Sequence, residues 1–388
     1  MRHFIKGLIG VVILIILVWL GSWYYAETRL KQLVMAQINA INATGTEQVS
    51  YDQIITSHSP LVISLALLNP KLEITQTSGP QSFSISTARI GGHIDLLNPF
   101  LLHFDLPHSF TLSGPGGSGA LTFATATATE TLPPSIWLGH RLNSPITGDA
   151  DFTGLDLLAS NGSLELAQID QLSLHQTTNP SASLKQTAVT STVLIQNFRV
   201  APIFTRMFNL PFNGTISRLA LSFTLSGPLN EAPFTGQNMD MQNDTQRKKL
   251  MLQSAYEWAK AGGHGQGHLD LLIGPSALTT DFTLGFDQQI QPKGTVEISA
   301  DHLITFGTTL ANSSPGLVDV INRIYQNLRP YLSDNGNVLN MHIAYNQSGV
   351  FLNSQKFDDM PFLDWNQLLN PKTAPSFAPG DGSGAAQP

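Results

Sequence analysis

His264 and His268 are the residues whose types and spacing most readily suggest chemistry. Two imidazoles four positions apart share one face of a helix, where they can bind a single zinc ion. The residues between them include Gly265 and Gly267, which oppose a helix, and no acid of the metalloprotease pattern is present. In an extended strand, four residues span about 13 Å, which is too far for one ion. The sequence therefore predicts no metal site here.

Acidic residues that stand close together suggest a second kind of chemistry. Two carboxylates can serve as acid and base in the hydrolysis of a glycosidic bond. The acids with suitable spacing are Asp149, Asp151, Asp358, Asp359 and Asp364. Adjacent acids in loops are more often solvated surface, so a hydrolase is the weakest of three functional hypotheses. It requires these acids to converge in a cleft.

Residues 114–119 read Gly-Pro-Gly-Gly-Ser-Gly and fit the spacing of a dinucleotide-binding loop. That loop needs a following helix, whose N-terminus binds the pyrophosphate. Here Leu121 and Phe123 follow in an alternating pattern that is typical of a strand, which favours a hairpin loop. The sequence also contains no nucleophile elbow and no P-loop. We therefore expect a protein that is not an enzyme and has no cofactor.

The composition argues against several classes of function. Charged residues make up 12% of the 388, about half of the roughly 25% usual for soluble domains, and hydrophobic residues make up 42%. The net charge of −7 gives no basic surface, so we expect no nucleic-acid partner. The absence of cysteine excludes disulfides, thiol nucleophiles and cysteine–zinc sites.

Residues 7–26 predict a transmembrane helix. They carry no charge, and twenty helical residues rise about 30 Å, the thickness of a hydrocarbon core. The aromatic residues expected at the membrane interface are Trp19, Trp23, Tyr24 and Tyr25. The residues before Ala26 do not form a small-residue cleavage site, so we expect an uncleaved signal-anchor.

The orientation of this anchor follows from the charges around it. Arg2 and Lys6 before the span are matched by Arg29 and Lys31 after it, so the basic side chains alone do not decide the orientation. The terminal amine before the span, Glu27 after it and the absence of cysteine favour an N-terminus in the cytoplasm. We therefore expect residues 1–6 to form a cytoplasmic stub and the bulk of the chain to lie in the periplasm, anchored to the inner membrane.

The spacing of apolar residues after the anchor divides the rest of the chain into three segments. Residues 27–43 predict an amphipathic helix, because their apolar residues follow the i, i+3, i+4 spacing. Residues 44–369 predict a β-rich domain with alternating apolar and polar positions, punctuated by turn pairs such as Asn161-Gly162. Residues 370–388 are rich in Pro, Gly, Ala and Ser and are expected to be disordered.

The fold class expected is mainly β with a few helices. We predict a long, curved antiparallel sheet, forming a groove or an open half-barrel, behind the transmembrane helix. Parallel strands would read as continuous apolar runs, which are absent. The helices expected within this domain are residues 244–261, residues 202–208 and a helix that Ser314 caps and Pro330 ends.

The order of several short motifs carries a resemblance to a known family. These motifs are Val49-Ser50-Tyr51-Asp52, Asn69-Pro70-Lys71-Leu72, Asn98-Pro99, Gln291-Pro292-Lys293-Gly294 and Met360-Pro361-Phe362-Leu363-Asp364-Trp365. Over residues 5–366 the chain resembles the bacterial membrane-anchored uncharacterised family called the domain of unknown function twenty-one twenty-five. It departs at His58-Ser59, where the family often has a glycine and an aromatic residue. No catalytic residues are known for this family, so the resemblance implies none here. The layout is also distantly similar to AsmA-like envelope proteins, whose curved sheets are thought to hold or conduct lipid, and this similarity implies a function of that class.

The main functional hypothesis is that the apolar face of the sheet binds or shields membrane lipid for maintenance of the cell envelope. The strands alternate, yet few helices are expected to cover their apolar face. The candidate lining residues are Leu61, Ile63, Leu65, Leu67, Leu219, Leu221, Phe223, Leu225, Phe282, Leu284 and Phe286. The alternative is an envelope structural or interaction protein, with a dry core and a protein partner.

Overall fold

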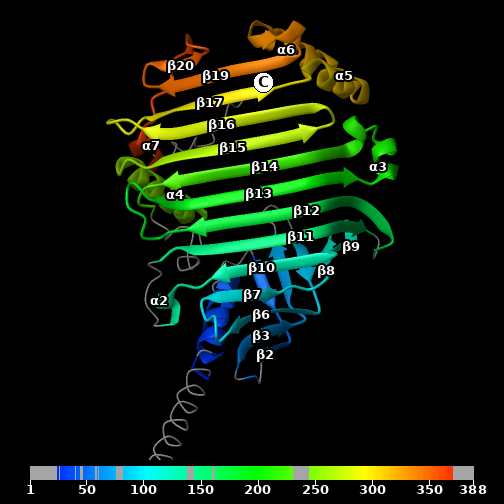
Figure 1. Ribbon diagram of the computed structural model, residues 1–388, viewed down its shortest axis with the longest axis vertical. Helices are drawn as coiled ribbons and strands as arrows, with labels where there is room; N and C mark the ends of the chain where they lie inside the picture. Colours follow the sequence, from blue (N-terminus) through cyan, green and yellow to red (C-terminus); the bar gives the residue numbers. More distant parts are fainter. Residues whose placement is uncertain are drawn as a thin grey trace, which may run out of the picture.

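In the computed structural model, the chain forms one large, open antiparallel β-sheet (Figure 1). The residues that it describes are 24–25, 27–39, 41–43, 47–56, 59, 61–75, 82–137, 144–159, 162–229 and 244–369. From β11 onward, strands that follow one another in the sequence lie side by side, so this part of the sheet is a meander. The prediction of a mainly β fold with a long antiparallel sheet is confirmed.

The second half of the sheet consists of long, mostly unbroken strands. They are β11 (Ile146–Ala159), β12 (Leu164–Thr178), β13 (Thr187–Val200), β14 (Thr215–Ser226), β15 (His264–Ile273), β16 (Ser276–Phe286), β17 (Pro292–Ala300), β19 (Val338–Asn346), β20 (Gly349–Leu352) and β21 (Gln355–Asp358). Each pairs with the next, and the short β18 (Leu332–Ser333) also pairs with β19. Their apolar and polar residues alternate, which is why they form a two-faced sheet.

The first half contains strands that are each interrupted near the middle. Their segments are β1 (Glu47–Ser50), β2 (Gln53–Thr56), β3 (Val62–Leu68), β4 (Lys71–Thr75), β5 (Ser82–Ser86), β6 (Arg89–Asp95), β7 (Leu101–Asp105), β8 (Ser109–Gly114), β9 (Gly117–Thr122) and β10 (Thr125–Thr131). One set of segments pairs in the order β2-β3-β6-β7-β10, and the other in the order β1-β4-β5-β8-β9. Both sets join β11.

The interruptions cross the sheet from strand to strand. Asn69, Gly154 and Asn197 adopt left-handed conformations, with φ of 48°, 56° and 53°. Asparagine and glycine tolerate this conformation better than other residues, so the sequence supplies suitable residue types there. Backbone hydrogen bonds still connect the strands at these points, as between the Asn69 amide and the Ala88 carbonyl at 2.9 Å. The sheet is therefore continuous across the interruptions.

Helices lie at the two ends of the strands. At one end are α3 (Pro202–Met207), η2 (Pro211–Gly214), α5 (Leu303–Ser313), η4 (Pro315–Leu317), α6 (Val318–Leu328), η5 (Arg329–Tyr331) and η6 (Asp334–Gly336). At the other are α4 (Asp244–Lys260) and α7 (Trp365–Leu369), and α2 (Pro134–Trp137) follows β10 (Figure 1). The predicted helices over residues 202–208 and 244–261 are confirmed within a residue or two.

The predicted helix that ends before Pro330 is confirmed as α6, but its predicted start at Ser314 was wrong, and one further helix was missed. Helix α5 was not predicted, because it holds Gly307 and three threonines and has no capping signal in the sequence. Ser314 makes no side-chain capping bond, and the helix expected to start there is divided into the turn η4, the helix α6 and the turn η5. Pro315 at the start of η4 and Pro330 within η5 account for this division, because proline donates no backbone hydrogen bond.

The main hydrophobic core lies where residues 27–39 form a helix against the first half of the sheet. Leu30 of this helix packs with Ile63, Leu65, Ile94 and Leu132, and all five side chains are buried. The described part of the segment 27–43, which was predicted to be an amphipathic helix, is helical and packs on the sheet through Leu30. This helix covers the apolar face at the β3 and β6 end of the sheet.

The predicted anchor, residues 7–26, lies outside the described residues apart from Tyr24 and Tyr25. These two tyrosines are helical and exposed. Over the described ranges, no helix combines the length and the apolar character that crossing a membrane requires. Residues 1–6 and 370–388, with the stub and the disordered tail predicted there, also lie outside the described residues.

Candidate functional site

The register of the sheet places one continuous line of residues across twelve strands. Residues directly opposite each other on antiparallel strands share a face. The line consists of Leu65, Gly92, Phe104, Ala128, Ala150, Leu174, Val193, Leu221, Leu269, Thr280, Ile298 and Met341. We call it, with its neighbours below, the apolar strip. Eleven strand spacings of about 4.8 Å give it a length of roughly 50 Å.

A second line runs beside the first and widens the strip. It consists of Ala126, Phe152, Leu172, Ile195, Leu219, Leu271, Leu278, Ala300 and Leu339. On the other side, Phe223, Gly267, Phe282, Val296 and Ile343 are directly opposite one another in turn. The apolar strip is therefore about three residues wide over β14 to β19.

Helices cover the apolar face at its margins but leave its middle half-exposed. Trp258 of α4 contacts Phe286 edge to face, with ring centroids 5.7 Å apart. At the opposite strand ends, Phe306 of α5 lies with Leu271 and Leu278 around a small apolar pocket. Between these margins, Leu174 is 39% exposed and Leu221 is 38% exposed. Among the described residues, the middle of the strip is therefore less covered than its margins.

The structure brings most of the predicted lining residues together. Those on β14 and β16, which are Leu219, Leu221, Phe223, Leu225, Phe282 and Leu284, share one face across β15. Gly265 and Gly267 of β15 leave room for the side chains of Leu225 and Phe282 from the neighbouring strands. A Cβ atom at Gly267 would lie 2.2 Å from Cζ of Phe282, so only glycine accommodates the phenylalanine ring there.

The other predicted lining residues lie at the margins of this face. Ile63 and Leu65 are buried under the N-terminal helix, and Leu67 follows them on β3. Leu61 precedes β3 and is exposed, so it does not belong to the alternating strand that was predicted to contain it. Phe286 lies under Trp258.

Sequence reasoning did not select Leu174, Leu269, Ile298 and Met341 as lining residues. Their alternation was visible in the sequence, but only the register places them in the same line.

One acid interrupts the apolar face. Glu130 of β10 stands between Leu102 and Gly148 in the line that begins with Ile63 and Ile94. Its half-buried position raises the pKa of the carboxyl above its usual value, because burial disfavours the charged form. The raised pKa is consistent with an apolar environment at this point.

Glu130→Gln is expected to become more stable relative to the wild type as pH rises. A raised folded-state pKa contributes stability below the unfolded pKa, and this contribution is lost as pH rises through the folded pKa. Glutamine is neutral at every pH, so the Glu130→Gln variant does not lose this contribution to stability as pH rises. Thermal unfolding at pH 4 and pH 8 measures the difference between the two proteins. Thr129→Ala, on the opposite face of β10, is the control and should show the same difference at both pH values.

The opposite face of the sheet carries a line of polar residues, which we call the polar row. It consists of Ser64, His93, His103, Thr129, Asp149, His175, Thr192, Ser222, His268, Asp281, Glu297 and His342. His175 lies 2.6 Å from Asp149, and His268 lies 2.8 Å from Asp281. These ion-pair partners are solvent-exposed, so this face is the solvated one.

Among the described residues, the histidines and acids named above form separate contacts and not one cluster. In the portion of the chain that the structure covers, no three His, Asp or Glu side chains are placed to hold one metal ion. His268 is bonded to an acid on the next strand rather than to a metal shared with His264. The acids proposed for hydrolysis also have separate roles, since Asp364 accepts backbone bonds from α7 and Asp359 pairs with Lys356.

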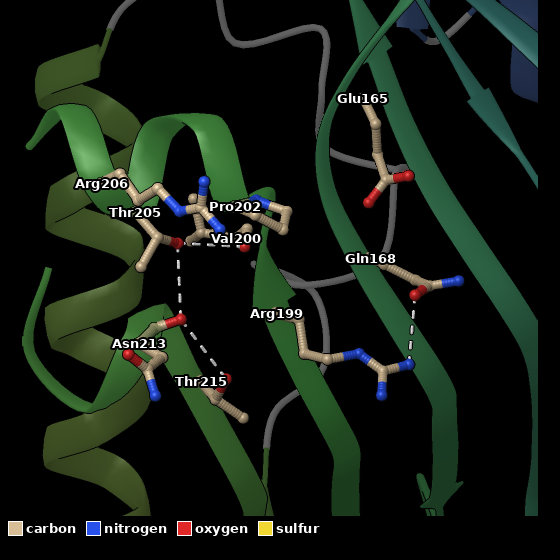
Figure 2. A pocket seen from close by; sticks show the side chains of 9 residues that line it. All are labelled: Glu165, Gln168, Arg199, Val200, Pro202, Thr205, Arg206, Asn213 and Thr215. Atoms are coloured by element: carbon tan, nitrogen blue, oxygen red, sulfur yellow. Dashed lines mark hydrogen bonds between the residues drawn. The ribbon is translucent and has the colours of Figure 1, made fainter.

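A polar pocket of about 440 Å³ lies where β12 and β13 meet α3 (Figure 2). It is lined by Glu165, Gln168, Arg199, Val200, Pro202, Thr205, Arg206, Asn213 and Thr215. Arg199 donates to Gln168 at 3.1 Å and pairs with Asp170. This pocket could not be predicted from the sequence, because its charged residues are far apart along the chain and belong to no motif.

Comparison with known families agrees with the resemblance seen in the short motifs. Residues 23–326 match the family described as uncharacterized protein conserved in bacteria (DUF2125). A comparison with curated proteins found no match. The expected similarity to AsmA-like envelope proteins stays a prediction. Because the matched region is more than half of the 388 residues, the chain belongs to the DUF2125 family.

Proposed function

We propose that the protein is a non-enzymatic, membrane-anchored periplasmic protein that binds lipid acyl chains on its apolar strip and so shields them from water. The observation that carries this proposal is the continuity of the strip. Half-exposed aliphatic and aromatic side chains occupy directly opposed positions on one strand after another. A contiguous exposed apolar surface of this kind marks a binding site.

The energetics favour an apolar ligand. Removing one methylene group from water contributes about 0.8 kcal/mol, so a chain of ten methylenes gains roughly 8 kcal/mol before ordering costs are subtracted. The backbone of the strip is already paired in the sheet, so a ligand gains little from hydrogen bonding there. The contacts available are therefore almost entirely apolar.

The shape of the strip favours an acyl chain over a protein partner. Measured across the strands it is roughly 50 Å long, and over β14 to β19 it is about three residues wide. Protein interfaces are usually broader patches with a polar rim. A long, narrow, apolar surface matches an extended hydrocarbon chain.

The position of the strip favours a lipid from a membrane. Its first strands, β3 and β6, contact the helix formed by residues 27–39. This helix follows the apolar segment 7–26, which we propose is the anchor in the inner membrane. The strip would then begin near the membrane surface and extend away from it.

Lipid extraction from the purified full chain tests this function. The protein is purified in a detergent that does not resemble phospholipid, and extracts are analysed by mass spectrometry. We expect diacyl lipid at one or more molecules per chain, remaining after extensive detergent washing. A chain that releases no lipid above the amount carried by an unrelated single-span membrane protein would contradict the proposal.

A further inference from the structure

The pocket of Figure 2 combines charges of opposite sign on separate walls. Arg206 comes from α3, Arg199 from β13 and Glu165 from β12. Arg199 is already balanced by Asp170. Among the described residues, neither Arg206 nor Glu165 forms an ion pair within 4 Å. The pocket therefore offers one uncompensated cation and one uncompensated anion, which is the arrangement that suits a zwitterion.

We propose that this pocket binds the phosphoethanolamine group of an aminophospholipid, with the phosphate at the arginines and the ammonium at Glu165. This inference rests on the proposed lipid function and names the headgroup that the protein selects.

The donor side of the pocket fits a phosphate. A guanidinium has five N–H donors in a planar fork that matches phosphate oxygens. Among the described residues, the Arg206 guanidinium is paired with no acid, and Arg199 is held in place by Gln168 and Asp170 with donors to spare. The amide of Asn213 stands on the same wall of the pocket (Figure 2). The two arginines thus present donors from different walls of the pocket, which suits a ligand end with several acceptor oxygens.

The acceptor side fits a primary ammonium. Glu165 is exposed at the pocket, and its carboxylate accepts hydrogen bonds from an –NH₃⁺ group. The quaternary ammonium of a choline headgroup has no N–H to donate, and a glycerol headgroup has no positive charge. Glu165 would therefore favour ethanolamine over both.

Exposed apolar side chains on and directly after α3, the helix that contributes Arg206 to the pocket, favour a lipid over a free solute. Ile203, Met207 and Phe208 flank Arg206 in the sequence and are 59%, 63% and 62% exposed. An exposed apolar surface next to a headgroup site gives the glycerol and acyl part of a lipid something to contact. A pocket for a small soluble zwitterion would not need it.

The test uses the full chain in nanodiscs that contain equal amounts of phosphatidylethanolamine, phosphatidylcholine and phosphatidylglycerol. Native mass spectrometry measures which lipid stays bound. We expect the wild type to prefer phosphatidylethanolamine by about tenfold, since a charge-assisted hydrogen bond is worth roughly that factor. Glu165→Gln should abolish the preference over phosphatidylglycerol, and Arg206→Gln should weaken binding of all three lipids. Arg323→Gln, on α6 and outside the pocket, is the matched control and should leave the preference unchanged.

Titration of the full chain with glycerophosphoethanolamine, which has no acyl chains, separates this inference from the proposed function. Weak binding that Arg206→Gln reduces about tenfold supports the pocket even if no lipid is extracted. If that binding equals or exceeds the affinity for lipid, a free phosphoethanolamine ester is the ligand. Equal lipid ratios for the wild type, Glu165→Gln and Arg206→Gln, together with no binding of the soluble probe, would overturn the proposal.

Discussion

Replacing Leu221 and Phe282 with glutamate is expected to lower the lipid bound to the full chain at least tenfold. Both side chains lie in the middle of the apolar strip, on β14 and β16, with β15 between them. Each replacement puts a charge where an acyl chain would lie, and desolvating a carboxylate without a partner costs several kcal/mol. A tenfold loss requires only about 1.4 kcal/mol. Mass spectrometry of extracted lipid, normalised to protein, measures the effect.

The control for this variant has the same added charge on the other face of the sheet. Ser222 neighbours Leu221 on β14, and Gln266 lies on β15 beside the polar row. Ser222→Glu with Gln266→Glu should retain the wild-type amount of lipid. A similar loss in both double variants would show that added charge, and not the apolar strip, determines lipid binding.

Trp258→Ala is expected to lower the free energy of unfolding by about 3–5 kcal/mol, the range for truncating a buried tryptophan. The indole is buried, donates to the Ser226 carbonyl at 3.0 Å and packs against Phe286. It also lies against Gly263, where a Cβ atom would be 2.3 Å from the ring. The indole thus fixes α4 to the margin of the apolar face. Urea unfolding followed by circular dichroism measures the change.

Trp258→Phe separates packing from hydrogen bonding at this position. It keeps most of the apolar contact and loses the hydrogen bond to Ser226. We therefore expect the free energy of unfolding to fall by only about 1 kcal/mol. Gln253→Ala, elsewhere on α4, should have little effect. If Trp258→Ala were as stable as the wild type, α4 would not depend on this contact for its place on the sheet.

The architecture was largely predictable, because a period of two survives in the sequence wherever one face of a strand is apolar. The pattern Leu219, Leu221, Phe223 and Leu225 predicts a two-faced strand by itself. Asparagine-glycine and glycine-proline pairs predict the turns between such strands. Helix α5 escaped prediction because its packing, such as Phe306 on Phe212, stabilises residues with weak helix propensity.

The lines across the sheet were not predictable, because they depend on register. Glu130 sits on the apolar face only because β10 pairs with β7 and β11 at particular residues. His175 and His268 are 93 positions apart, yet they stand in one row for the same reason. A shift of one residue in any strand would move its residues to the other face. No local pattern in the sequence fixes this choice across so many strands.

The absence of cysteine makes the most direct test of the apolar strip simple. Leu221→Cys and Ser222→Cys each introduce one thiol, on opposite faces of β14, for labelling with the same fluorophore in the full chain. Lipid carrying a nitroxide on its acyl chain is then added in nanodiscs, and quenching of each label is measured. Strong quenching at position 221 and little at position 222 is the result expected if acyl chains lie on the strip. Equal quenching at both positions, or none at either, would contradict it.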